Sequence, residues 1–375
     1  MLIGVPKEIK NHEYRIGLTP AAVREYVENG HDVIVENNGG AAIGFTNEQY
    51  TEAGASIVDT PEEIFERADM IVKVKEPQPN ECKMLREGQI LYTFLHLAPD
   101  PTQTELLGKA GCTAIAYETV TDNRNGLPLL APMSEVAGRM SIQAGAHYLE
   151  KAHGGSGTLL GGVPGVAPGK VLIIGGGVVG TNAAKMAIGL GAEVTILDRS
   201  LPRLRELDDI FAGRVQTVYS TVDAIDKYSR EADLVVGAVL IPGAAAPKLL
   251  TRENIKKMKP GSVLVDVAID QGGCFETSKA TTHQDPVYVI DDVVHYCVAN
   301  MPGGVARTST IALNNATLPY GIALANKGVK AMLENDHLLK GLNMHKGKIT
   351  YKAIHDDLGE QLGLDYQDPR EALQG

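Results

Sequence analysis

The sequence predicts an α/β protein with two doubly wound domains, a cleft between them, and long helices that link them. Short apolar segments alternate with amphipathic segments along most of the 375 residues. This alternation restarts near Lys170, after a glycine-rich stretch, and a glycine motif lies at the restart. At about 150 residues per domain, the length also favours two domains.

The first part of the chain predicts a mostly parallel sheet. Thr19 and Pro20 predict the start of a helix, which Asn29 and Gly30 end. Thr46 with Gln49, and Thr60 with Glu63, fit capping boxes. A further helix is expected over residues 101–110. The expected strands are residues 2–5, 31–36, 70–74, 90–95 and 113–116.

The second part of the chain predicts a sheet of six strands, the number found in a dinucleotide-binding fold. Helices fit between most of these segments. The six apolar segments are residues 171–174, 194–197, 217–220, 234–236, 263–265 and 288–290.

Two long helices and a glycine-rich segment mark the boundaries between the domains. Residues 134–153 and 308–325 each predict a long helix. Residues 154–169 contain seven glycines, which fit either a flexible surface loop or backbone that packs closely against protein or cofactor. We expect residues 129–304 to form the nucleotide-binding domain. Residues 1–128 and 305–375 would then form a discontinuous substrate and catalytic domain.

The composition is that of an ordinary globular protein with a net charge of −11. This charge and the absence of a dense Lys/Arg run argue against nucleic acid as a partner. The N-terminus lacks a signal-peptide pattern, and no segment is apolar enough to predict a membrane span. Cys82, Cys112, Cys274 and Cys297 are isolated in sequence, as is typical of a reducing compartment. We therefore expect a cytoplasmic protein without a membrane partner.

The glycine motif predicts a nucleotide site of the Rossmann type. Gly175-x-Gly177-x-x-Gly180 follows an apolar strand and precedes a helix. Gly175 permits the tight turn, Gly177 lets the backbone approach a pyrophosphate, and Gly180 lets the helix pack on the strand. Asp198 ends the next strand, at the spacing expected of a residue that binds ribose hydroxyls. Asp198 favours NAD, although Arg199 or Arg203 would suit the extra phosphate of NADP.

Five polar residues are predicted at the carboxyl ends of strands, where open α/β sheets bind ligands. They are Arg15, Lys75, His96, Asp270 and Asn300. Taken singly, each also fits a solvated or turn residue. Together they offer an anion clamp, a group that polarises a carbonyl, and a general acid or base.

The sequence resembles the family of alanine dehydrogenases and transhydrogenase alpha subunits along essentially its whole length. Residues 3–9 (IGVPKEI) and 13–20 (EYRIGLTP) resemble the N-terminal signature of this family. Residues 171–184 (VLIIGGGVVGTNAA) resemble its nucleotide motif. Residues 265–273 (VDVAIDQGG) and 300–309 (NMPGGVARTS) are most similar to the alanine dehydrogenase branch.

The resemblance implies a role for each of the five polar residues. Arg15 would bind the substrate carboxylate, Lys75 would bind the pyruvate carbonyl, and Asn300 would help to position the substrate. His96 would be the general acid or base, and Asp270 would activate the water or ammonia that adds to the substrate carbon. The implied reaction is the reversible NAD-dependent oxidative deamination of L-alanine to pyruvate and ammonia.

The resemblance also implies a cofactor site for NAD and a homo-oligomer, commonly a hexamer and sometimes a dimer. The implied cofactor residues are Ser134, Gly175, Gly177, Val178, Val179, Gly180, Asp198, Arg203, Ser220, Val239, Leu240, Val267, Ala268, Ile269, Asp270, Lys279, Val298, Ala299, Asn300 and Met301. No metal site is expected. The alternatives are an NAD(H)-binding transhydrogenase alpha-type subunit and a non-catalytic NAD-binding protein.

Overall fold

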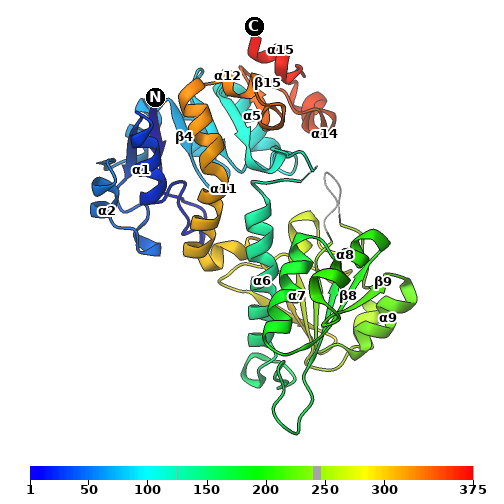
Figure 1. Ribbon diagram of the computed structural model, residues 1–375. Coiled ribbons are helices and arrows are strands. Elements are labelled where there is room, and N and C mark those ends of the chain that lie inside the picture. The colour runs from blue at the N-terminus through cyan, green and yellow to red at the C-terminus, as the bar shows by residue number, and fades with distance from the viewer. Residues whose placement is uncertain (125, 240–245, 375) are drawn as a thin grey trace. The chain divides into compact units, whose positions relative to one another are not determined.

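A computed structural model describes residues 1–124, 126–239 and 246–374. The chain divides into two compact units, and the first is discontinuous in sequence (Figure 1). Unit 1 comprises Met1–Pro132 and Val305–Gly375, and unit 2 comprises Met133–Gly304. Each unit is an α/β structure built on one sheet, as the sequence predicts.

The sheet of unit 1 has the strand order β15-β14-β6-β5-β4-β1-β2-β3. The six strands from the first part of the chain are parallel, and β14 and β15 add antiparallel strands at one edge. The strand order reverses between β1 and β4. The strands are β1 (Leu2–Val5), β2 (Asp32–Glu36), β3 (Ser56–Val58), β4 (Met70–Val72), β5 (Ile90–Thr93), β6 (Thr113–Ala116), β14 (Leu342–His345) and β15 (Lys348–Ile349).

Side-chain capping marks the starts of several helices in unit 1. Thr19 accepts from Ala22 N at the start of α1, and Thr46 with Gln49 forms the full capping box of α2. At α3, the contact is one-sided, because Thr60 accepts from Glu63 N. The helices are α1 (Pro20–Glu28), α2 (Asn47–Glu52), α3 (Pro61–Arg67), α4 (Pro79–Cys82), α5 (Pro101–Ala110), α11 (Ala306–Lys327), α12 (Lys330–Leu333), α13 (Asp336–Leu339), α14 (Lys352–Leu362) and α15 (Pro369–Gln374), with 3-10 turns η1 (Ala41–Ile43) and η2 (Tyr117–Thr119).

Helix α11 returns the chain to unit 1, where buried polar groups fix its position. The Asn314 side chain accepts from Thr19 N and donates to Gly17 O. The Tyr92 hydroxyl donates to Thr317 O at 3.1 Å. The C-terminal part of the chain is therefore tied to the loop that follows β1.

The sheet of unit 2 has the strand order β12-β13-β11-β10-β7-β8-β9, which reverses between β7 and β10. The sequence predicts six strands, and the described residues form seven. The additional strand is β13, which pairs in parallel with β11, whereas β12 is antiparallel at the edge. Asp291 and Asp292 both have positive φ and make the two-residue turn between β12 and β13. The strands are β7 (Lys170–Ile174), β8 (Glu193–Asp198), β9 (Gln216–Tyr219), β10 (Leu234–Gly237), β11 (Val263–Asp266), β12 (Val287–Ile290) and β13 (Val293–Tyr296).

The first long helix is shorter at its end than the sequence predicts. Helix α6 ends at Tyr148, and a separate 3-10 turn, η3, follows it. Gly154 has a φ of +90° and closes that turn. The remaining elements are α6 (Ala131–Tyr148), η3 (Lys151–His153), α7 (Val178–Gly189), α8 (Leu201–Phe211), α9 (Val222–Glu231), α10 (Arg252–Lys256), η4 (Val267–Gln271) and η5 (Met301–Val305).

The glycine-rich segment 154–169 is mostly exposed but packs closely at a few points. A Cβ at Gly155 would lie 2.3 Å from Tyr148 O, and one at Gly161 would lie 2.4 Å from Leu190 O. These glycines let the segment fold back onto the ends of α6 and α7. The segment is therefore a surface loop with a few points of close backbone packing against the protein.

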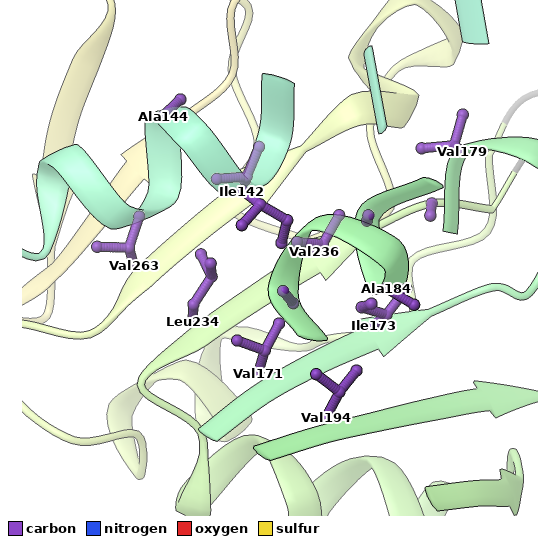
Figure 2. Close-up of a cluster of buried hydrophobic side chains, with 14 of the residues drawn as sticks. Ile142, Ala144, Val171, Ile173, Val179, Ala184, Val194, Leu234, Val236 and Val263 are labelled. Atoms are coloured by element: carbon purple, nitrogen blue, oxygen red, sulfur yellow. The ribbon is translucent and has the colours of Figure 1, made fainter. Parts of the chain in front are cut away.

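One hydrophobic cluster of unit 2 packs the sheet against helices that include α6 and α7, and a second cluster packs it against α9 and α10. Figure 2 shows Ile142 of α6 near Val236 of β10, with Val179 and Ala184 of α7 in the same cluster. These side chains are almost completely buried. The core holds the start of α7 against the end of β7, where the glycine motif lies. Among the described residues, no helix combines the length and apolar character needed to cross a membrane.

Candidate active site

The loops of unit 1 bring several charged residues to the carboxyl edge of its sheet. Lys75 follows β4, His96 follows β5, and Glu118 follows β6. The sequence predicts Lys75 and His96 at the ends of strands. Strands β4 and β5 end earlier, at Val72 and Thr93, so both residues lie in the loops that follow. Because parallel strands end at the same edge, these loops lie next to one another.

Glu76 connects the residues at this edge. Its Oε2 lies 3.7 Å from Lys75 Nζ and 3.9 Å from His96 Nδ1, and its Oε1 accepts from Lys10 Nζ. Burial raises the pKa of Glu76, but the contacts with His96, Lys75 and Lys10 lower it by more. The net pKa of Glu76 is therefore well below its usual range. Glu76 is therefore an ionised carboxylate that holds two of the predicted functional residues in place.

His96 has an unusual backbone conformation and a second carboxylate neighbour. Its φ is +47°, which is rare outside glycine and is often retained at functional sites. Glu118 Oε1 accepts from His96 N at 2.6 Å, and the imidazole stacks on the Phe94 ring. Burial lowers the pKa of His96, but Glu118 and Glu76 raise it more, and the net pKa is above its usual value.

Arg15 lies in the loop after β1, on the other side of the point where the strand order reverses. It is almost completely buried, and its Nε and Nη2 donate to Glu13 at 2.7 and 2.6 Å. A Cβ at Gly17 would lie 2.2 Å from Val72 O, so this loop packs directly against the end of β4. The fold thus brings the loop of Arg15 to the segment that carries Lys75.

A buried ion cluster supports the backbone beneath these residues. Lys73 Nζ donates to Glu8 Oε2 at 3.1 Å and to Glu81 Oε1 at 2.9 Å. Glu8 Oε1 also accepts from Val74 N at 2.6 Å and from Lys75 N at 3.2 Å. The side chains of Lys73, Glu8 and Glu81 are nearly inaccessible to solvent. Such a cluster fixes a local geometry, because removing one partner would leave a buried charge.

The glycine motif of unit 2 has the geometry that a dinucleotide site requires. Gly175 has a φ of +105°, and a Cβ at Gly180 would lie 1.9 Å from Gly175 O. Gly177 caps the N-terminus of α7, and a Cβ there would meet nothing within 4 Å. The start of α7 therefore offers backbone N–H groups beside open space, which fits a phosphate group.

Asp198 and Arg203 lie around this glycine turn. Asp198 Oδ2 accepts from Gly176 N at 2.7 Å, and its Oδ1 accepts from Ser200 N at 2.8 Å. Arg203 donates from Nε to Gly176 O, from Nη2 to Thr181 Oγ1 and from Nη1 to Glu206. All three nitrogens of the Arg203 guanidinium therefore donate hydrogen bonds to groups of the protein.

The other predicted cofactor residues of unit 2 follow the ends of neighbouring strands. Ser220 follows β9, Val239 follows β10, Val267–Gln271 forms η4 after β11, and residues 298–301 follow β13. Within these segments lie Ala268, Ile269, Asp270, Val298, Ala299, Asn300 and Met301. Ser134 lies in α6, one turn before Gly138, which packs on Val179 O. Leu240 lies outside the described residues.

Three of these positions have local features that bear on function. Asp270 is exposed on η4, and Asn300 has a φ of +84° with its carbonyl oxygen 2.8 Å from His283 Nε2. Lys279 is exposed, and its backbone N donates to the Tyr288 hydroxyl. Asp270 and Asn300 therefore both lie in segments that follow strands, at the carboxyl edge of the sheet.

Sequence reasoning missed the carboxylates that position the predicted residues. In unit 1 these are Glu13, Glu76 and Glu118. In unit 2, the buried Asp266 accepts from Ala268 N and Cys274 N and so fixes the turn that carries Asp270. Glu76 directly follows Lys75 in sequence, which was a signal, but the pairing of Glu118 with His96 depends on the order of the strands.

Two family models cover most of the chain. Residues 4–137 match "Alanine dehydrogenase/PNT, N-terminal domain", and residues 141–352 match "Alanine dehydrogenase/PNT, C-terminal domain". The chain belongs to the alanine dehydrogenase/PNT family. The resemblance in the sequence motifs is confirmed.

Individual members of the alanine dehydrogenase/PNT family are similar along their full length. An alanine dehydrogenase of Halomonas elongata is 61% identical over 98% of both chains. An alanine dehydrogenase of Bacillus subtilis is 56% identical over 100% of this chain and 98% of the relative. A solved L-alanine dehydrogenase superimposes with a TM-score of 0.93 at 51% identity, covering 96% of this chain and 99% of the other. A transhydrogenase from Sinorhizobium meliloti shares the fold, with a TM-score of 0.81 at 23% identity.

Proposed function

We propose that this member of the family catalyses the reversible NAD-dependent oxidative deamination of L-alanine to pyruvate and ammonia. The observation that carries the proposal is the 61% identity, along nearly the full length of both chains, to an alanine dehydrogenase. The charged groups at the carboxyl edge of unit 1 and the glycine turn of unit 2 supply chemistry that suits this reaction. The proposal assigns the substrate carboxylate and carbonyl to unit 1 and the cofactor to unit 2.

On the substrate side, the proposal gives Arg15 the carboxylate of alanine or pyruvate. Glu13 would keep the buried guanidinium of Arg15 in one orientation through its contacts with Nε and Nη2. A guanidinium suits a planar carboxylate, which it can bind through two parallel hydrogen bonds. Lys75 would donate to the carbonyl oxygen of pyruvate, where negative charge develops during reduction.

The cofactor proposal rests on the glycine turn and the start of α7. The open space at Gly177 and the unpaired N–H groups of α7 fit a pyrophosphate. When bound, NAD⁺ supplies the hydride acceptor. We include the predicted residues at the other strand ends in this site, with Lys279 as the most peripheral member.

Asp198 supports NAD rather than NADP as the cofactor. Its carboxylate ends β8 and would repel a phosphate on the ribose. Of the two nearby cations that could offset this repulsion, Arg199 and Arg203, the guanidinium of Arg203 is already held by Gly176, Thr181 and Glu206. The ribose hydroxyls would instead donate to Asp198, which retains acceptor capacity beside its two backbone contacts.

The chemistry at the substrate proceeds in balanced steps. Loss of hydride from the Cα of L-alanine leaves an imine of pyruvate, water adds to that carbon, and ammonia leaves. The overall products are pyruvate, ammonium, NADH and one proton. We assign proton transfer to His96 and activation of the attacking water or ammonia to Asp270. Asn300 would hold the substrate in position.

Location and assembly belong to the proposal as well. We propose a cytoplasmic enzyme that acts on small-molecule substrates. We also propose a homo-oligomer, either a hexamer or a dimer. Light scattering of the purified protein would distinguish these two assemblies from a monomer.

The direct test measures NADH formation when purified protein is mixed with NAD⁺ and single amino acids. We expect rapid turnover with L-alanine and much slower turnover with glycine, L-serine and L-lysine. NADP⁺ in place of NAD⁺ should reduce kcat/KM strongly. NADH binding without turnover of any amino acid would contradict the proposal. Hydride exchange between nucleotides on addition of a partner protein would then support the transhydrogenase alternative.

A further inference from the structure

A cluster of three side chains at the end of α6 has the composition and geometry of a metal site. His147, Glu150 and His153 are spaced three residues apart, and their ligand atoms all lie within 4.8 Å of one another. All three residues belong to unit 2 and lie outside the glycine turn and the strand-end loops described above. The sequence analysis expected no metal site.

The backbone explains why these three side chains meet. On a continuous helix, positions 147 and 153 would point about 120° apart. Helix α6 instead ends at Tyr148, and the chain turns tightly: Glu150 N donates to His147 O, and His153 N donates to Glu150 O. Leu149 is fully buried and anchors the turn. The two imidazole rings thereby lie against each other, with centroids 3.9 Å apart and ring planes tilted by 38°.

The distances between ligand atoms fit a small tetrahedral cation. Glu150 Oε2 lies 3.3 Å from His153 Nδ1, and Glu150 Oε1 lies 3.8 Å from His147 Nδ1. In a tetrahedral zinc site with bonds of about 2.0–2.1 Å, neighbouring ligand atoms are about 3.3–3.4 Å apart. The distances to His153 and His147 involve different oxygens of Glu150, and the three ligand atoms lie within 4.8 Å of one another, so side-chain rotation would bring one oxygen and the two nitrogens onto one ion.

The Nδ1 of His153 gives a second, independent indication of a ligand. This atom is shielded from solvent and makes no hydrogen bond, although it faces the Glu150 carboxylate. A buried nitrogen without a hydrogen-bond partner is costly. A cation between the imidazoles and the carboxylate would satisfy this nitrogen, and the carbonyl end of α6 favours positive charge at the same place.

We propose that His147, Glu150 and His153 bind one Zn²⁺ ion per chain, with solvent in the remaining coordination position. Imidazole nitrogens select borderline transition metals such as zinc over Mg²⁺, which prefers oxygen ligands. The side chains of His147 and Glu150 are half exposed or more, so an ion reaches the site from solvent. The ion would clamp the end of α6 to the turn that begins the glycine-rich segment 154–169.

The test is calorimetric titration of the chelator-treated full-length protein with Zn²⁺. We expect one Zn²⁺ per chain and no competition from a large excess of Mg²⁺. His147→Ala, His153→Ala and Glu150→Gln should each weaken Zn²⁺ binding by at least about 10-fold. This is a lower bound, because loss of a residue that only contacts a ligand already weakens metal binding by about 10-fold or more. His355→Ala is the matched control, because His355 also lies beside a carboxylate, Asp356, on a helix of unit 1.

A spectroscopic readout identifies the ligands directly. Co²⁺ added in place of Zn²⁺ should give the visible absorption of a tetrahedral site, and the three variants should lose it while keeping a wild-type circular dichroism spectrum. Zn²⁺ binding that all three variants retain would overturn the proposal. Absence of Zn²⁺ binding by the wild-type protein, or equal binding of Mg²⁺, would also overturn it.

Discussion

His96 is the residue whose surroundings determine most about the proposed chemistry. Two carboxylates, Glu118 and Glu76, outweigh the effect of burial and keep its pKa above the usual value. In the direction of alanine oxidation, His96 must be neutral to accept a proton. The rise of kcat/KM with increasing pH should therefore follow the deprotonation of His96 in the free enzyme.

Glu118→Gln tests this electrostatic role. The amide keeps an acceptor for His96 N but removes the charge that raises the His96 pKa. The His96 pKa then falls, more of the neutral form is present at low pH, and the rising limb of the kcat/KM profile moves to lower pH. The control is Glu253→Gln, which changes an exposed carboxylate of α10 in unit 2. A profile that does not move would show that another group titrates.

His96→Ala tests the assignment of the acid or base itself. A positioned general acid or base contributes about 10²–10⁴-fold to the rate, so kcat should fall by that factor. NADH binding, measured by fluorescence, should remain, because the glycine turn belongs to unit 2. Near-normal turnover by this variant would exclude His96.

Asp198→Ala tests the choice between NAD and NADP. Removing the carboxylate takes away both the ribose acceptor and the repulsion of the extra phosphate. The ratio of kcat/KM for NAD⁺ to that for NADP⁺ should therefore fall, by about 10-fold for each 1.4 kcal/mol of lost discrimination. An unchanged ratio, with a folded protein, would show that Asp198 does not select the cofactor.

At the scale of single elements, the junction of β7 and α7 separates folding from binding. Gly180 has no room for a Cβ, because Gly175 O would lie 1.9 Å away. Gly177 has room within the protein, and its φ of −71° suits any residue. Gly180 is therefore required by packing, whereas Gly177 is required only if a ligand approaches the backbone there.

Three Gly→Ala variants of α7 and its cap should thus behave differently. Gly180→Ala should lower the free energy of unfolding by about 1–3 kcal/mol through overpacking. Gly189→Ala, on the same helix with open space, should raise it by about 0.4–1 kcal/mol. Gly177→Ala should leave stability nearly unchanged but weaken NADH binding at least about 10-fold, equivalent to ~1.4 kcal/mol. Chemical denaturation and NADH titration measure both quantities, and intact binding by Gly177→Ala would argue against phosphate at this turn.

The elements also show where the sequence is informative and where it is not. The starts of α1 and α2 and the glycine turn follow from local chemistry, so Thr19, Thr46 and Gly175 predicted them. The end of α6 depends on tertiary packing of Leu149 and Gly155, which a helical pattern does not reveal. For the same reason, the sequence did not predict the meeting of His147, Glu150 and His153.

At the scale of the whole molecule, each unit has predicted functional residues at the same topological place. In both sheets the strand order reverses next to the first strand of the unit, between β1 and β4 and between β7 and β10. Arg15 and Lys75 lie in the loops that flank the first reversal, and Gly175 and Val239 flank the second. Ligands of open α/β sheets bind at such points. The alternation of strands and helices was sufficient to predict the fold class.

The partners of the functional residues required the three-dimensional structure. Glu118 lies 22 residues from His96 in sequence, and nothing in the spacing indicates that their strands are neighbours. The β12–β13 turn was missed because two consecutive aspartates are a less common signal than Asn-Gly. The predicted residues were individually visible as polar residues near apolar segments, but their pairing depends on the order of strands in the sheet.

In the proposed reaction, hydride passes directly from the Cα of L-alanine to NAD⁺. The most direct measurement uses L-alanine deuterated at Cα and determines by mass spectrometry where the deuterium goes. Our account predicts that the deuterium appears in the reduced nicotinamide and that turnover forms pyruvate with an equal amount of NADH. Deuterium released to solvent, or reduced cofactor formed without pyruvate, would contradict it.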